Sequence, residues 1–197
     1  MTVRVVVAED EAIIRLDLKE ILEEEGYVVV GDTGRGDTAI ELVREQQPDL
    51  VILDIKMPGM DGLTAARTIT GERLAAVLIL TAFSQHDLVD QARDAGALGY
   101  LVKPFQKSDL IPAIEVALGR FQELKAIADQ VQSLAQQLET RKLVDRAKGM
   151  LMDKFKMSEN DAFNFIQKTA MRERVTMKEI AQRIIAGELK PPENPEN

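Results

Sequence analysis

Leu50-Val51-Ile52-Leu53-Asp54 is a short run in which four apolar residues lead directly into a carboxylate, and Leu50–Leu53 is predicted to be a strand. Four more short apolar runs occur within the first 105 residues: Val3–Ala8, Tyr27–Val30, Ala76–Leu80 and Gly99–Val102. Amphipathic helical patterns separate them, such as Ala12–Glu25, Asp37–Gln46 and Asp87–Ala95. Strands that are apolar throughout and separated by helices are typical of a parallel sheet covered on both faces. A five-stranded, doubly wound α/β domain is therefore predicted.

The rest of the chain is predicted to be helical, because strand signals stop at Lys107. Ser108–Glu139 is expected to form a long helix in which apolar residues follow 3–4 spacing: Phe121, Leu124, Ala128, Val131, Ala135 and Leu138. This spacing favours a short coiled coil, and the alternative is a helix that packs on its own chain. Ser158 and Thr176 each begin a capping-box pattern. Three short helices are expected: Arg141–Asp153, Glu159–Arg172 and Met177–Ala186.

These patterns divide the chain into four parts. A flavodoxin-like α/β domain is predicted over residues 1–120 and a helical, coiled-coil-like linker over 121–139. A small three-helix all-α domain is expected over 140–190, followed by a flexible tail over 191–197. Residues 1–120 contain 12 Lys/Arg and 21 Asp/Glu, whereas residues 141–190 contain 12 Lys/Arg and 7 Asp/Glu. The opposite net charges indicate different partners for the two halves.

The composition excludes several kinds of protein. The 197 residues include no cysteine, which rules out disulfides and thiolate metal sites. No stretch approaches the roughly 18 apolar residues that a membrane span needs, and the first apolar run is too short for a signal peptide. A cytoplasmic protein without a membrane partner is expected.

Polar residues follow four of the predicted strands at the points where these end: Glu9-Asp10-Glu11, Asp54, Thr81 and Lys103-Pro104. Since open parallel sheets bind ligands at the carboxyl ends of their strands, these residues are expected to meet at one edge. Crowded carboxylates favour Mg²⁺, and Asp54 can attack a phosphoryl group as a carboxylate nucleophile. Lys103 and Thr81 can hold the phosphoryl oxygens. A single Asp after a strand is more often a turn residue or a helix cap, but here four strand ends agree.

Four segments carry these residues in a characteristic order: Ala8–Glu11, Leu53–Gly62, Leu80–Ala82 and Tyr100–Phe105. In these segments residues 1–120 resemble the receiver domain of two-component response regulators. The resemblance implies that a sensor histidine kinase phosphorylates Asp54, and that Mg²⁺ is held by Asp10, Asp54 and the Lys56 carbonyl, with Glu9 acting through a water. It also implies a switch pair of Thr81 and Tyr100 and a cis peptide bond between Lys103 and Pro104.

An enzyme is another possibility for this part of the chain. Phosphatases of the haloacid-dehalogenase type use Asp, Thr and Lys on a similar sheet, but need a second acid two residues after the nucleophile. Lys56 occupies that position here. A regulator rather than an enzyme is therefore expected.

The run Ala147-Lys148-Gly149-Met150-Leu151-Met152 is followed by Ala162-Phe163. On these residues, roughly Leu134–Leu189 resembles the ANTAR domain, an RNA-binding antitermination module. The resemblance implies binding to hairpin RNA and control of transcription termination. Cationic side chains are candidates for fixing an RNA backbone: Arg141, Lys142, Arg146, Lys148, Arg172, Arg174 and Lys178.

Other readings of the C-terminal part stay open. Leu143, Ala147, Met150, Leu151 and Phe163 are expected in a core, and Gly149 could permit close backbone approach or helix packing. The part could instead bind DNA through a recognition helix or bind a protein partner. A homodimer formed through Phe121–Leu138 on phosphorylation is also expected.

Overall fold

The first part of the chain is built on one parallel β-sheet. In the computed structural model, which describes residues 2–82 and 86–191, the strands are β1 Arg4–Ala8, β2 Val28–Thr33, β3 Leu50–Asp54, β4 Ala76–Thr81 and β5 Gly99–Val102. Their order is β2-β1-β3-β4-β5 and every pairing is parallel, which confirms the predicted doubly wound sheet. β2 runs three residues beyond its predicted end, through polar Asp32 and Thr33. It is an edge strand paired only with β1, so its backbone can continue the ladder without apolar side chains.

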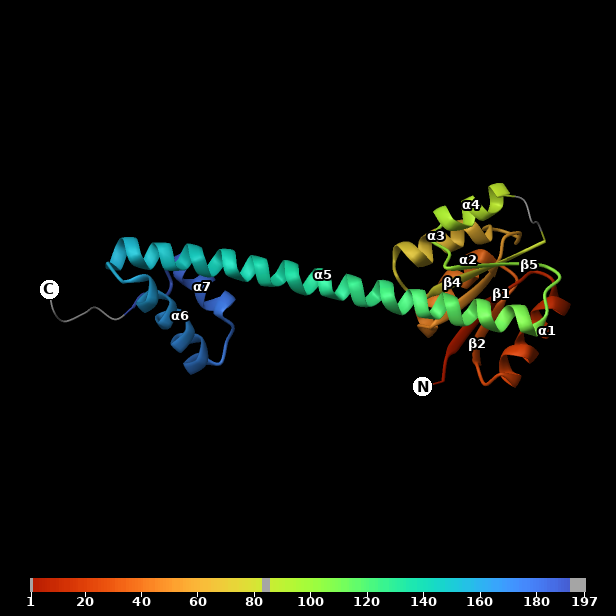
Figure 1. Cartoon of the computed structure of the whole chain (residues 1–197), viewed down its shortest axis with the longest axis horizontal. Coiled ribbons are helices and arrows are strands. Elements are labelled where there is room, and N and C mark those ends of the chain that lie inside the picture. Colours follow the sequence, from red (N-terminus) through yellow and green to blue (C-terminus); the bar gives the residue numbers. More distant parts are fainter. Residues whose placement is uncertain (1, 83–85, 192–197) are drawn as a thin grey trace. The chain divides into compact units, whose positions relative to one another are not determined.

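Helices cover both faces of this sheet (Figure 1). Successive residues of β1 point to opposite sides, so that Val5 and Val7 enter one core cluster while Val6 and Ala8 enter the other. The first cluster is closed by α1 (Ala12–Glu24) and by the N-terminal part of α5 (Lys107–Phe155). The second is closed by three helices: α2 (Gly36–Gln46), α3 (Gly62–Gly71) and α4 (His86–Asp94).

Two helices of this region depart from the sequence patterns. Ile13 and Leu16, two apolar residues of the helix predicted over Ala12–Glu25, are 85% and 66% exposed, and the fully buried residues are Leu18 and Leu22. Helical periodicity alone does not say which of several apolar stripes meets the sheet. α3 has no counterpart among the predicted helices; there the Asp61 side chain accepts a hydrogen bond from the Thr64 amide at 2.9 Å and caps the first turn.

The chain divides into two compact units, Met1–Ala126 and Ile127–Asn197. In the second unit, the C-terminal part of α5 packs with α6 (Glu159–Glu173) and α7 (Met177–Ala186) around an apolar core. The helix predicted over Arg141–Asp153 is not separate, because α5 continues to Phe155. Thr140 Oγ1 donates to the Gln136 carbonyl at 2.9 Å within the helix instead of capping a new one.

The two predicted N-caps are confirmed. Ser158 Oγ accepts from the Asp161 amide at 3.1 Å. Thr176 and Glu179 form a reciprocal capping box, with bonds of 3.2 and 2.8 Å between each side chain and the other's amide. Within residues 2–82 and 86–191, no helix has the length and apolarity needed to cross a membrane. Most of the predicted tail, residues 192–197, lies outside the described residues.

Candidate functional site

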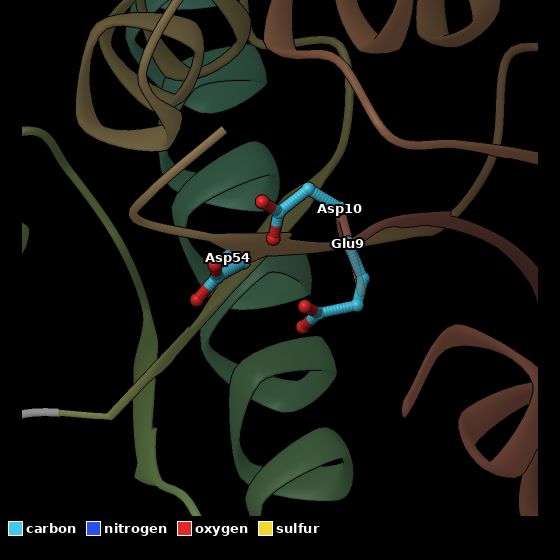
Figure 2. A group of neighbouring side chains, drawn as sticks. All are labelled: Glu9, Asp10 and Asp54. Carbon is cyan, nitrogen blue, oxygen red and sulfur yellow. The ribbon is translucent and has the colours of Figure 1, made fainter. Parts of the chain in front are cut away.

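The acidic residues expected at the sheet edge are brought together there. Asp54 is the last residue of β3, and Glu9 and Asp10 directly follow β1. Because β1 and β3 are parallel neighbours, their carboxyl ends meet. Figure 2 shows the carboxylates of Glu9, Asp10 and Asp54 turned toward a shared space.

Lys103 joins two of these carboxylates. Its Nζ lies 2.5 Å from Glu9 Oε2 and 3.1 Å from Asp54 Oδ1, and the three side chains are 10%, 0% and 8% exposed. The peptide bond that follows, Lys103–Pro104, is cis as predicted. With Asp10 included, three carboxylates face one ammonium in this cluster of described residues, which leaves a net negative charge.

Burial dominates the protonation of this cluster. Burial raises the pKa of Glu9, with the charge of Asp54 adding to the rise and Lys103 opposing it. Burial also raises the pKa of Asp54, again against the effect of Lys103. Burial lowers the pKa of Lys103, but its hydrogen bonds and charge interactions with Glu9 and Asp54 outweigh this and leave that pKa raised. Further positive charge would therefore stabilise the ionised carboxylates.

The cluster fits a hard divalent cation. Ligand oxygens of Glu9, Asp10 and Asp54 all lie within 4.8 Å of one another. Oxygen donors alone, with no sulfur or imidazole, form the set that Mg²⁺ or Ca²⁺ prefers. Asp10 and Lys56 line a cavity of about 740 Å³ beside the cluster, which gives solvent and small ligands access to it.

A glycine allows the loop after β3 to fold back against Asp54. The Gly62 amide donates to the Ile55 carbonyl at 2.9 Å. A Cβ at Gly62 would lie 1.9 Å from the Asp54 carbonyl oxygen, so no other residue fits without moving the backbone that carries Asp54.

Thr81 and Tyr100 lie on the two strands beyond β3. Thr81 ends β4 and is 1% exposed, next to Leu80, whose register partner is Asp54. Tyr100 is half-buried in β5 and packs against the core cluster that includes Ala92 and Ala95, on the α4 side. Counting outward from β3, which carries Asp54, Thr81 lies on the next strand and Tyr100 on the strand after that, where it packs on the α4 side.

The seven cationic candidates for RNA contact lie in the second unit, in different surroundings. Lys142, Arg146 and Arg174 are exposed and have no carboxylate partner among the described residues. Arg141 is 83% exposed, with its nearest carboxylate 3.9 Å away. The others are bound by neighbouring carboxylates: Lys148, Arg172 and Lys178.

One expectation for this unit is wrong. Ala147 and Leu151 are fully buried as predicted, but Phe163 is 38% exposed. It lines a cavity of about 630 Å³ together with Arg141 and Met177. A Cβ at Gly149 would meet no atom within 4 Å, so no other helix in the described part of the chain packs closely against this glycine. Phe163 is exposed because Ala162, directly before it, takes the core position, and successive residues of a helix point about 100° apart.

An exposed apolar stripe on α5 was only partly predicted. Five large residues at 3–4 spacing are 54–61% exposed: Leu124, Ile127, Val131, Leu134 and Leu138. The predicted stripe had Phe121 and two alanines in place of Ile127 and Leu134, but Phe121 packs on the core of the first unit. Searching for large residues alone at this spacing would have found Ile127 and Leu134.

Comparison with known proteins defines the class. The profile of the response regulator receiver domain matches residues 5–115, and that of the ANTAR domain matches residues 132–185. The chain belongs to the response regulators that carry a receiver domain and a C-terminal ANTAR domain.

Individual relatives agree with this assignment. The chain is 57% identical over 182 residues to the transcriptional regulatory protein PdtaR of Mycobacterium tuberculosis, covering 92% of this chain and 89% of that protein. The receiver domain of the response regulator NarL from M. tuberculosis superimposes with a TM-score of 0.58 at 32% identity, over 60% of this chain and 97% of that one. CheY in the CheX-CheY-BeF3-Mg²⁺ complex from Borrelia burgdorferi gives a TM-score of 0.55 at 25% identity, over 57% of this chain and 86% of the matched one.

Proposed function

We propose that this protein is a phosphorylation switch in which a sensor histidine kinase phosphorylates Asp54 and thereby controls an RNA-binding module acting on transcription termination. The supporting observation is the position of Asp54. It is a buried carboxylate 3.1 Å from the Lys103 ammonium, with two further acidic side chains beside it. A role in transcription is consistent with the name of the relative PdtaR. Since both proposed partners act inside the cell, we infer a cytoplasmic location.

In the proposed reaction, a carboxylate oxygen of Asp54 attacks the phosphorus of a phosphohistidine. The bond between phosphorus and the histidine nitrogen breaks, an acyl phosphate forms on Asp54, and the imidazole takes up a proton. Lys103 then moves from Asp54 to a phosphoryl oxygen, and Thr81 donates its hydroxyl to another.

Mg²⁺ is the proposed cofactor, as in the CheY complex from Borrelia burgdorferi. We assign Asp10, Asp54 and the Lys56 carbonyl as its ligands, with Glu9 acting through a water. When bound, the ion would offset the negative charge of the phosphoryl oxygens. The fully buried Glu9 would keep Lys103 in place during the transfer, since its Oε2 lies 2.5 Å from the Lys103 ammonium.

The signal is proposed to leave the site through Thr81 and Tyr100. A phosphoryl group adds about two negative charges and three acceptor oxygens. Reorientation of Thr81 toward it would free space beside β5, and inward packing of Tyr100 would change the surface near α4. The burial of Thr81 and the packing of Tyr100 against the α4 side of the core support this route.

The output is proposed to be binding of hairpin RNA by the second unit. The ANTAR match over residues 132–185 supports RNA over duplex DNA or a protein. The exposed cations Lys142, Arg146 and Arg174 are the best candidates for phosphate contacts. Because Lys148 and Lys178 are each held by a carboxylate, we place them second.

Phosphorylation is proposed to bring two chains together through the exposed stripe Leu124–Leu138. Large apolar residues at 3–4 spacing form the seam of a parallel two-stranded coiled coil. All five residues of the stripe are more than half exposed in the single chain, so a second copy would remove substantial apolar surface from water.

Hairpin-RNA binding tests the proposed function directly. The intact protein is titrated into hairpin RNAs at fixed salt, with and without Mg²⁺ and acetyl phosphate as phosphodonor. Tighter binding after phosphorylation is expected in the wild type and not in Asp54→Asn. If neither state binds hairpin RNA while duplex DNA or a protein is bound, the RNA proposal fails and the receiver assignment is unaffected.

A further inference from the structure

The second unit has a cavity of about 630 Å³ beside its core. Eight lining residues, from Ser133 to Lys148, recur along one face of α5, and Phe163 of α6 and Met177 of α7 complete the lining. The volume lies within the roughly 300–1,000 Å³ typical of sites for small ligands. The α5 stripe Leu124–Leu138 does not account for this cavity, and of the five proposed phosphate contacts only Lys148 lines it.

The lining offers an aromatic ring and side-chain amides. Phe163 is 38% exposed, although Ala162, directly before it, and Ile166, about one helical turn after it, are fully buried. Gln136 and Gln137 supply groups that can both donate and accept hydrogen bonds. A flat ligand with hydrogen-bonding edges suits this combination.

The charges of the lining disfavour an anion inside the cavity. Lys148 Nζ is already bound to Asp145 Oδ1 at 3.0 Å and to Glu159 Oε1 at 2.9 Å. Asp145 itself would repel a phosphate. Arg141, by contrast, is 83% exposed and 3.9 Å from its nearest carboxylate, so it can meet an anion outside the cavity.

We propose that this cavity binds one unpaired base of an RNA loop, stacked on Phe163, while Arg141 contacts the adjoining phosphate. The inference rests on the proposed RNA binding and adds the means by which a loop is distinguished from a stem. Sequence-specific RNA recognition relies on unstacked loop bases, which pack on aromatic side chains and bond through their edges. The bases of a stem are paired and stacked, and so cannot enter.

A matched pair of substitutions tests the proposal. Hairpins with a constant stem and a randomised loop are selected on the intact wild-type protein in the presence of Mg²⁺ and acetyl phosphate, and their affinity is compared under the same conditions with that of the same stem without a loop. Phe163→Leu keeps an apolar side chain but removes the ring, and is expected to weaken hairpin binding about 5- to 150-fold. It should leave binding to the loopless stem unchanged. Phe155→Leu is the control, because Phe155 is equally exposed, at 39%, and lies outside the cavity lining.

A fluorescence measurement separates stacking from an indirect effect on folding. The chain contains no tryptophan, so F163W and F155W each carry a single reporter. The selected hairpin is expected to quench the fluorescence of F163W and not that of F155W, and F163W should retain wild-type affinity.

The outcomes distinguish this proposal from the proposed function. If wild type binds the hairpin but F163L binds it equally well, or F163W is not quenched, the base proposal is overturned and a protein side chain becomes the alternative occupant. If wild type binds no hairpin, RNA binding itself is wrong and this proposal falls with it.

Discussion

Lys103 and Lys148 each bind two carboxylates, as the exposed Lys107 also does, but the surroundings of the first two differ. The partners of Lys103 are Glu9 and Asp54, 0% and 8% exposed. The partners of Lys148 are Asp145 and Glu159, 54% and 70% exposed. Water cannot replace a buried partner, so removing one ion of the first group leaves uncompensated charge, whereas water and salt can solvate the second. The same local pattern therefore makes a buried charge cluster in one unit and a surface contact in the other.

The largest effect is expected from removing the proposed nucleophile of the buried cluster. Asp54→Asn is expected to abolish phosphorylation, because the amide offers no carboxylate oxygen to attack phosphorus. Intact-mass spectrometry after incubation with acetyl phosphate and Mg²⁺ measures it. Asp17→Asn, which changes an exposed carboxylate on α1, is the control and should incorporate phosphate like the wild type. Wild-type incorporation into Asp54→Asn would refute the assignment.

Substituting the two lysines compares them directly. Lys103→Met is expected to lower the free energy of unfolding by about 3–5 kcal/mol, because it leaves buried carboxylates without their ammonium. Lys148→Met should change it little, since both partners stay hydrated. Urea denaturation of the intact protein in Mg²⁺-free buffer gives both values. Added Mg²⁺ should restore part of the loss in Lys103→Met, and equal losses in the two variants would remove the distinction.

The comparison extends to exposed apolar residues on α5. Val131→Glu is expected to prevent self-association of the phosphorylated protein, because two charges would meet in the apolar seam. Gln132→Glu adds the same charge one residue away, outside the stripe, and should leave association intact. Light scattering reports the mass of each. A phosphorylated wild type that stays monomeric would rule out the dimer.

The smallest expected effect concerns individual cations of the second unit. Lys142→Gln should reduce the slope of log affinity against log salt by about 1, as for the loss of one phosphate contact. Lys148→Gln should change the slope less, because two carboxylates already neutralise that ammonium. Titrations of hairpin RNA at several salt concentrations provide the slopes. A larger change for Lys148→Gln would reverse the proposed ranking.

Much of the fold could be predicted from local patterns. Uninterrupted apolar runs identified all five strands, and capping residues identified the starts of α6 and α7. The predictions failed where the local sequence was compatible with more than one structure. Apolar residues occur on more than one side of α1, and only the sheet decides that Leu18 and Leu22 are buried while Ile13 is exposed. Nothing near Thr140 required α5 to end, and it continues to Phe155.

The sequence by itself determined which chemical groups stand at the ends of the strands, because parallel strands separated by helices must bring those ends to one edge. Only the tertiary structure decided how each group behaves. Burial raises the pKa of Asp54, the approach of Gly62 restricts the loop that follows it, and the neighbours of Phe163 leave its ring at a cavity instead of in the core. The physical reason is that residue type and spacing are local properties, whereas desolvation and exposure depend on which distant segments pack against a side chain.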